Sequence, residues 1–132
     1  MIGKILCVDD DPITVMLCRK VINKAEFAKI TDSANNGEEA LQYFDALISC
    51  DRDTYPELIL LDLNMPVMGG WEFLDNFSNG IYPTYFSNTK VIVLSSTIDP
   101  RDVEKTKNYP MVVEFLSKPI TTNVLEQLKQ LI

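Results

Sequence analysis

Residues 58–70 read LILLDLNMPVMGG, and this stretch indicates both the fold and the place to look for function. Its first four residues are aliphatic without interruption, which is typical of a strand buried on both faces of a parallel sheet. The run stops at Asp62, and Pro66 with Gly69 and Gly70 predicts a tight loop before the next element. Asp62, an acidic side chain at the end of a buried strand, is therefore the first candidate for chemistry.

Apolar runs and amphipathic stretches alternate on both sides of this segment. We expect strands at residues 2–8, 29–34, 58–61, 91–94 and 112–116. We expect helices from residue 12 to about 25, over 38–48 and 71–77, from 100 to about 108, and over Val124, Leu125, Leu128 and Leu131, with a long loop at 81–89. Five strands alternating with five helices predict an α/β fold, a doubly wound parallel sheet covered on both faces, as one domain over residues 1–132.

Composition excludes several classes of function. The chain has 132 residues, a net charge of −7 and no histidine, so direct nucleic-acid binding and any chemistry that needs its own imidazole are disfavoured. Cys7, Cys18 and Cys50 match no metal-binding spacing and are interpreted as reduced thiols. The sequence shows no membrane-spanning segment and no signal peptide, so we expect a cytoplasmic protein.

Polar residues that suit phosphate or metal chemistry follow four of the five predicted strands. These residues are Asp9 and Asp10, Asp62, Ser95, and Lys118. Strand ends of one sense lie along one edge of a parallel sheet, where ligands bind in the crevice at which strand order reverses. Each residue also has a local explanation, namely a helix cap, a turn or a solvated side chain. Their coincidence at four strand ends favours a shared site.

Three carboxylates at one edge repel one another unless a cation lies between them. Oxygen ligands without histidine or cysteine indicate Mg2+ rather than zinc. Asp62 is a candidate nucleophile that forms an acyl phosphate, Lys118 supplies a mobile positive charge, and Ser95 supplies a hydroxyl. We therefore predict a site for Mg2+ and a phosphoryl group.

The same residues resemble a known family, the receiver domains of two-component response regulators. Residues 5–11 (ILCVDDD) resemble its first strand and acidic pair, and residues 60–70 resemble its phosphoacceptor segment. Residues 91–96 (VIVLSS) resemble the strand with the switch hydroxyl, and residues 115–119 (FLSKP) resemble its aromatic, lysine and proline signature. The likeness covers essentially the whole chain and is nearest to the single-domain type, which implies the flavodoxin-like strand order 2-1-3-4-5.

The resemblance also implies a role for each site residue. Asp62 accepts the phosphoryl group, and Lys118 binds its oxygens. Mg2+ is bound directly by Asp10, Asp62 and the backbone carbonyl of Asn64, with Asp9 acting mainly through a water. Ser95 and Phe115 turn inward on phosphorylation and change the surface formed by the last two predicted helices and the strand at 112–116. The peptide between Lys118 and Pro119 is expected to be cis.

The resemblance implies a signalling phosphoacceptor that catalyses only its own phosphorylation and slow autodephosphorylation. The donor would be a sensor histidine kinase or a phosphotransfer protein, and the downstream partner and oligomeric state stay open. One alternative is a haloacid-dehalogenase-like phosphohydrolase, with Asp9 as nucleophile and Asp11 as acid/base. A second alternative is an interaction module that kept the fold and lost the chemistry.

Overall fold

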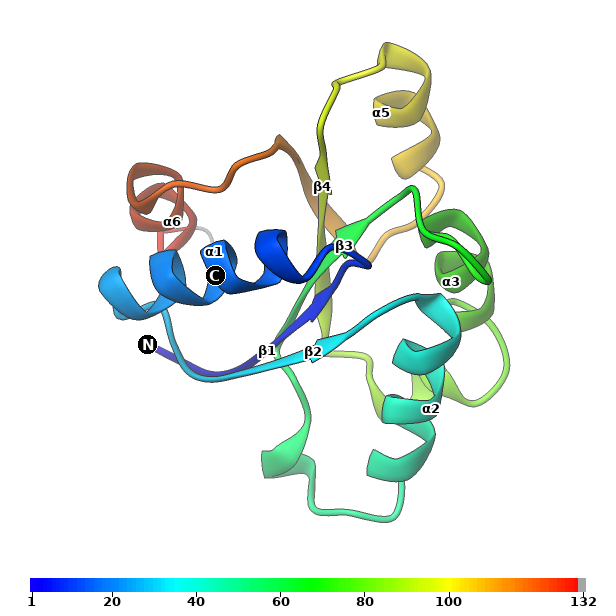
Figure 1. Cartoon of the computed structure of the whole chain (residues 1–132). Helices are drawn as coiled ribbons and strands as arrows, with labels where there is room; N and C mark the ends of the chain where they lie inside the picture. The colour runs from blue at the N-terminus through cyan, green and yellow to red at the C-terminus, as the bar shows by residue number, and fades with distance from the viewer. Residues whose placement is uncertain (131–132) are drawn as a thin grey trace.

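The computed structural model describes residues 1–130 and shows a parallel sheet between two layers of helices (Figure 1). The strands are β1 (Ile2–Val8), β2 (Ala28–Ala34), β3 (Leu58–Asp62), β4 (Lys90–Ser95) and β5 (Val112–Ser117). The helices are α1 (Pro12–Lys24), α2 (Gly37–Leu47), α3 (Gly70–Phe77), α4 (Tyr82–Tyr85), α5 (Pro100–Thr106) and α6 (Thr122–Leu128), with a 3-10 turn at Arg52–Thr54. The predicted helical position Leu131 lies outside the described residues.

The sheet has the order β2-β1-β3-β4-β5, and each neighbouring pair is parallel. The predicted doubly wound α/β fold and its strand order are therefore confirmed. Strand order reverses between β1 and β3, so the crevice expected from topology lies beyond their carboxyl ends. In the register, Asp62 lies beside Leu94, and Ser95 lies beside Ser117.

Two buried clusters flank the sheet. One cluster lies under α1 and α6 and is mostly aliphatic, with Cys7, Cys18 and Ile22 among its members. The other lies under α2, α3 and the neighbouring loops and is rich in aromatic rings, centred on Phe44. Central strands that are apolar on both faces explain why β3 is buried throughout.

Side-chain caps fix where the helices begin. Asp11 accepts a hydrogen bond from the Ile13 N–H at 3.0 Å, and Asp99 accepts one from the Arg101 N–H at 2.9 Å. These caps satisfy backbone donors that a helix leaves free at its first turn. The predicted cap at Asp11 and the predicted start of a helix at Asp99 and Pro100 are confirmed.

Residues 81–89 differ from the prediction of a plain connecting loop. They include the short helix α4, followed by the buried Phe86. The Phe86 ring lies 4.7 Å from that of Phe44, and the Tyr82 ring lies 5.7 Å from that of Phe77. These aromatic contacts hold the segment against the core, a tertiary effect that local composition does not reveal. Among the described residues, no helix is long and apolar enough to cross a membrane.

Candidate functional site

The turn after β1 presents two aspartates at the carboxyl edge of the sheet. Asp9 is 6% exposed, and its backbone N–H donates to the Ala34 carbonyl at 3.1 Å, which ties the turn to β2. Its carboxylate accepts a hydrogen bond from the Asp11 N–H at 2.9 Å. Asp10 is exposed. The turn therefore holds one buried carboxylate in a fixed position beside one that is open to solvent.

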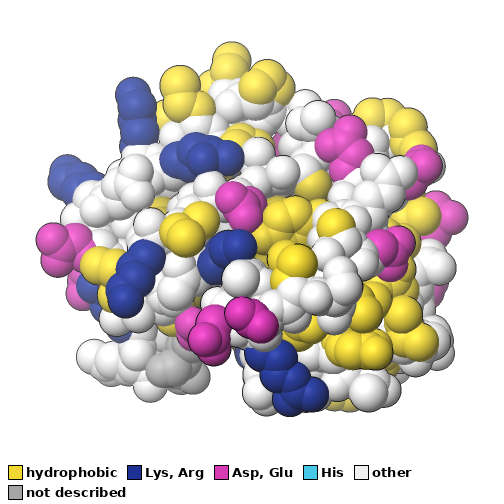
Figure 2. Space-filling model, turned by 90° about the horizontal axis from the view of Figure 1, so that it is seen from below, with side chains coloured by type: hydrophobic (Ala, Val, Ile, Leu, Met, Phe, Trp, Pro, Cys, Tyr) yellow, Lys and Arg dark blue, Asp and Glu magenta, His cyan; other side chains and the backbone are white. Residues whose placement is uncertain are grey.

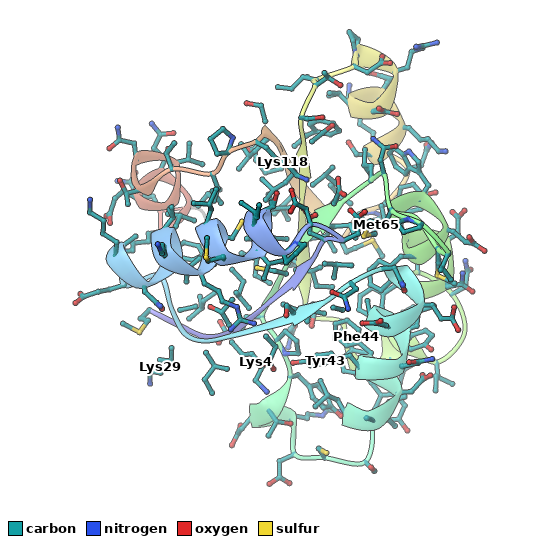
Figure 3. The ribbon with its side chains drawn as sticks, viewed as in Figure 1. Lys4, Lys29, Tyr43, Phe44, Met65 and Lys118 are labelled. Atoms are coloured by element: carbon teal, nitrogen blue, oxygen red, sulfur yellow. The ribbon has the colours of Figure 1, made fainter. Side chains whose placement is uncertain are left out.

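Asp62 and Lys118 complete the centre of the site. Asp62 ends β3 and is 7% exposed, and Lys118 directly follows β5. The Lys118 ammonium lies 2.7 Å from Asp9 Oδ2 and 3.3 Å from Asp62 Oδ1, so it bridges the two buried carboxylates. Figure 3 shows Lys118 beyond the carboxyl ends of the strands, far from Tyr43 and Phe44. Sequence reasoning gave Lys118 the role of binding phosphoryl oxygens and did not predict its contact with Asp9.

The three carboxylates suit a hard divalent cation. Asp9, Asp10 and Asp62 each offer an oxygen atom, and these atoms lie within 4.8 Å of one another. Mg2+ takes oxygen ligands and keeps part of its water shell, and the exposed Asp10 leaves room for such waters. The residues present therefore fit the predicted ion. The proposed ligation by the Asn64 carbonyl stays a prediction.

Burial controls the charge state of the site. It raises the pKa of the Asp62 carboxyl, and the Asp9 charge adds to this rise, while Lys118 and the Asn64 N–H oppose it. Burial alone would lower the pKa of the Lys118 ammonium, but its hydrogen bond to Asp9 and the charges of Asp62 and Asp9 outweigh burial and raise it. Lys118 thus stays charged. Its single positive charge does not neutralise both of the carboxylates that it contacts, those of Asp9 and Asp62.

Ser95 lies next to this centre at the end of β4. The side chain is 4% exposed, and its hydroxyl oxygen accepts a hydrogen bond from the Thr97 N–H at 3.4 Å. The Ser95 carbonyl accepts from the Lys118 N–H at 2.8 Å. The Lys118–Pro119 peptide is cis, as expected. The ends of β4 and β5 are therefore tied directly to each other.

The loop after Asp62 is held by close backbone packing. A Cβ atom at Gly70 would lie 2.6 Å from the Asp62 carbonyl oxygen, so only glycine fits there. The Gly37 N–H donates to the Met68 carbonyl at 2.8 Å, which fastens the loop to α2. Val67 has a φ of +67° and a side chain that is 76% exposed. The sequence predicted a tight loop here but not the hydrogen bond that joins it to Gly37.

Phe115 lies apart from the acidic centre, within β5. Its side chain is half-buried and packs against the aromatic-rich cluster, in register with Val93. It also lines a hollow between α5 and β5 together with Ile98 and Val103. The structure therefore places Phe115 between the core and the α5–β5 surface, while Asp9, Asp10, Asp62 and Lys118 converge on one site.

Exposed apolar side chains lie on the segments that follow β1 and β4. Ile13 and Leu17 on α1 are 62% and 45% exposed, and Ile98 after β4 is 55% exposed. The buried side chains of α1 are those of Cys18 and Ile22. The apolar stripe of α1 is thus divided between the core and the surface near the site.

The phosphohydrolase alternative requires Asp11 as an acid/base, and the structure gives Asp11 another task. Its carboxylate accepts hydrogen bonds from the Ile13 N–H and from the Thr14 hydroxyl at 3.1 Å, so it caps α1. It is not among the carboxylates that cluster around Asp62. This geometry weighs against the alternative.

The fold and the site define a doubly wound α/β protein with an acidic, lysine-bridged centre at the switch point of its sheet. The chain belongs to the family of response regulator receiver domains, whose model matches residues 5–130. This match confirms the resemblance of the four sequence segments. It also gives the coarse function, which is two-component signalling by a phosphoacceptor domain.

Solved structures and curated relatives agree with this assignment. A two-component response regulator from Cytophaga hutchinsonii is 32% identical with a TM-score of 0.87, covering 98% of this chain and 95% of that one. The response regulator TrrA from Thermotoga maritima, solved in complex with Mg(2+)-BeF, is 26% identical with a TM-score of 0.73, covering 99% of this chain and 100% of that one.

Among curated proteins, the nitrate/nitrite response regulator NarL of Escherichia coli K12 is 38% identical over 71 residues, which is 54% of this chain and 30% of NarL. A protein-glutamate methylesterase/protein-glutamine glutaminase of Syntrophomonas wolfei is 26% identical over 98% of this chain and 34% of its own length. The chain thus spans about a third of the length of these curated relatives.

Proposed function

We propose that Asp62 accepts a phosphoryl group from a phosphohistidine on a sensor histidine kinase or a phosphotransfer protein. The observation that carries this proposal is that oxygen atoms of Asp9, Asp10 and Asp62 lie within 4.8 Å of one another, with Lys118 bridging Asp9 and Asp62. A buried carboxylate with an ammonium and two further carboxylates beside it suits phosphoryl transfer, which depends on positioning and charge neutralisation.

In this reaction an Asp62 oxygen attacks phosphorus, a phosphorus–oxygen bond forms, and the bond from phosphorus to the donor imidazole breaks. Mg2+ held by Asp10, Asp62 and the Asn64 carbonyl, with Asp9 through a water, would supply the positive charge that offsets repulsion between the carboxylates and the phosphoryl oxygens. The Lys118 ammonium moves from Asp9 toward one phosphoryl oxygen, and the Ser95 hydroxyl donates a hydrogen bond to a second phosphoryl oxygen.

The donor has to reach a carboxylate that is only 7% exposed, so it contacts the rim of the site. The helix α1, which follows Asp9 and Asp10, carries the exposed apolar side chains Ile13 and Leu17, and Leu17 lines a recess with Lys118. These residues fit a partner whose histidine projects from an apolar helical surface, and burying them would contribute to docking. Such partners work in the cytoplasm, and we place this chain there too.

Phosphorylation would then act as a switch. The phosphoryl group stabilises the conformation in which Ser95 and Lys118 bind its oxygens. It shifts the equilibrium between the two conformations by its differential affinity for them. Phe115 moves inward with Ser95 and alters the hollow between α5 and β5 that it lines with Ile98 and Val103. The readout surface is formed by α5, β5 and α6, and its downstream partner is a protein.

Nuclear magnetic resonance with Mg2+ and beryllofluoride would show shifts over residues 95–128, and their absence would contradict the switch.

Intact-mass analysis with acetyl phosphate and Mg2+ tests the phosphoacceptor role. The wild type should gain one phosphoryl group. The gain should be absent when a metal chelator is added and absent in the Asp62→Asn variant. Asp11→Asn is the matched control, because Asp11 caps α1 and is not in the cluster. Phosphoryl gain by Asp62→Asn together with loss of gain by Asp9→Asn or Asp11→Asn would favour the phosphohydrolase instead.

A further inference from the structure

The helices α3 and α5 contact each other, but the core holds them unequally. In Figure 1, α5 projects at the top of the molecule, above α3. The helix α3 buries Gly70, Phe73, Leu74 and Phe77, whereas α5 buries only Thr106. A helix with so few buried side chains depends on its remaining contacts for its position. The contacts of α5 with α3 therefore help to set the surface that α5 forms with β5.

Lys105 joins the last turn of α5 to the first turn of α3. Its ammonium lies 4.4 Å from the centre of the Trp71 ring, a distance at which the ring attracts the cation. Within residues 1–130 this ammonium forms no ion pair, so the charge of Lys105 acts on the ring. Lys105 is exposed and Trp71 is half-buried, so the contact can open without exposing the core.

A tyrosine just after α5 forms the buried part of the same junction. The Tyr109 ring is 9% exposed and lies 5.8 Å from the Trp71 ring. Its hydroxyl donates a hydrogen bond to the carboxylate of Asp75, which lies one turn after Trp71 on α3. Its backbone N–H donates to the Thr106 carbonyl at 3.0 Å. Tyr109 thus anchors the junction, and Lys105 is its exposed and releasable contact.

We propose that Lys105 is a positioning residue that clamps α5 against α3 and so opposes the switch. The regulatory part of this inference rests on the proposed function. In the structure the clamp coexists with two contacts that the proposed switch breaks. These are the ion pair of Lys118 with Asp9 and the hydrogen bond from the Thr97 N–H to the Ser95 hydroxyl. The clamp therefore belongs to the resting conformation, which these contacts define.

The switch has to open the clamp because the two helices respond differently to it. Phe115 lines the hollow between α5 and β5 together with Val103 of α5, so its inward movement displaces α5. The buried side chains of α3 keep that helix in place, and Lys105 is drawn away from Trp71. Loss of a contact that only the resting conformation makes shifts the equilibrium toward the switched one. A cation–π contact at an exposed site corresponds to a factor of about two to five in that equilibrium.

Amide hydrogen exchange tests the clamp without any phosphorylation. Lys105→Met removes the charge and keeps a similar helix propensity, while Lys105→Arg keeps a cation over the ring. Lys107→Met is the matched control, because Lys107 follows α5 directly and pairs with Glu104 at 3.0 Å. Exchange over residues 100–106 should be about two to five times faster in Lys105→Met than in the wild type, and unchanged in the other two variants. Equal exchange in Lys105→Met and the wild type, or equally fast exchange in all three variants, would overturn the clamp.

The rate of phosphorylation by acetyl phosphate with Mg2+ then tests whether the clamp opposes the switch. Lys105→Met should take up the phosphoryl group about two to five times faster than the wild type, because more of it is in the switched conformation. Lys105→Arg and Lys107→Met should match the wild type. A rate for Lys105→Met at or below that of the wild type would overturn the regulatory role. If none of the four proteins takes up a phosphoryl group, the proposed function fails, and hydrogen exchange still decides the clamp.

Discussion

The two ends of the sheet solve opposite problems. At the carboxyl end, Asp9 and Asp62 are buried close together, and the half-buried Lys118 forms ion pairs with both. At the amino end, aromatic rings pack together and polar side chains are hydrogen-bonded. Buried like charges cost stability, so their presence at one end indicates that this end is organised for function.

The amino end shows how the same chain builds a purely structural region. The Thr89 hydroxyl donates to the Pro56 carbonyl at 2.7 Å, and the Tyr82 hydroxyl donates to Asp45 at 2.6 Å. Phe86 packs between the rings of Phe44 and Tyr55, each 4.7 Å away. Figure 2, which views the molecule from below, shows hydrophobic side chains gathered on the side where α2, α3 and α4 lie.

The largest expected effect is a loss of stability caused by a substitution at the amino end of the sheet. Phe86→Ala removes a side chain that is 3% exposed, and we expect a loss of about 3–5 kcal/mol in the free energy of unfolding. Urea denaturation measures this loss, with Tyr85→Ala as control, because Tyr85 is 38% exposed. At a temperature where the variant stays folded, its gain of phosphoryl mass should match that of the wild type; a variant that folds but takes up no phosphoryl group would contradict the division of tasks.

The second effect is at the loop that follows Asp62. In Gly70→Ala, the new Cβ would lie 2.6 Å from the Asp62 carbonyl oxygen and 2.8 Å from the Leu63 Cα. Because both are backbone atoms, the loop has to shift, and we expect a loss of about 1–3 kcal/mol and slower phosphorylation. Gly3→Ala is the control, since its Cβ would meet only the flexible Glu57 carboxylate at 3.3 Å. Equal phosphorylation rates for the two variants would show that this loop does not position Asp62.

The third and smallest effect has the opposite sign. Asp62→Asn removes a buried negative charge while Lys118 keeps its partner Asp9, so in metal-free buffer we expect a gain of about 1 kcal/mol in stability. Burial raises the pKa of Asp62, so the charged carboxylate destabilises the folded wild type at pH values above this raised pKa. As the pH falls through the raised pKa, the carboxylate takes up a proton and this destabilisation is lost. The difference in stability between the wild type and Asp62→Asn should then narrow.

Thermal unfolding over a pH series measures this difference, with the exposed Asp53→Asn as control. Lower stability of Asp62→Asn at neutral pH would mean that the Asp62 carboxylate stabilises the metal-free fold, and it would weaken the contrast between the two ends.

Local sequence patterns predicted the strands and the edge of the sheet at which Asp9, Asp10, Asp62 and Lys118 gather, because each signal lies in one short segment. Continuous apolar runs placed β3 and β4, and the polar residues that follow them marked the carboxyl edge. The helix α4 was missed, because its order depends on the contact of Phe86 with Phe44, which are far apart in the chain. The Asp9–Lys118 contact was missed for the same reason, since it joins residues 109 positions apart.

The most direct test of the account is to identify the residue that carries the phosphoryl group. The protein is treated with acetyl phosphate and Mg2+, the acyl phosphate is reduced with borohydride, and the resulting homoserine is located by tandem mass spectrometry. The account predicts homoserine at position 62 alone. Homoserine at position 9 or 10 with Asp62 unchanged would contradict it.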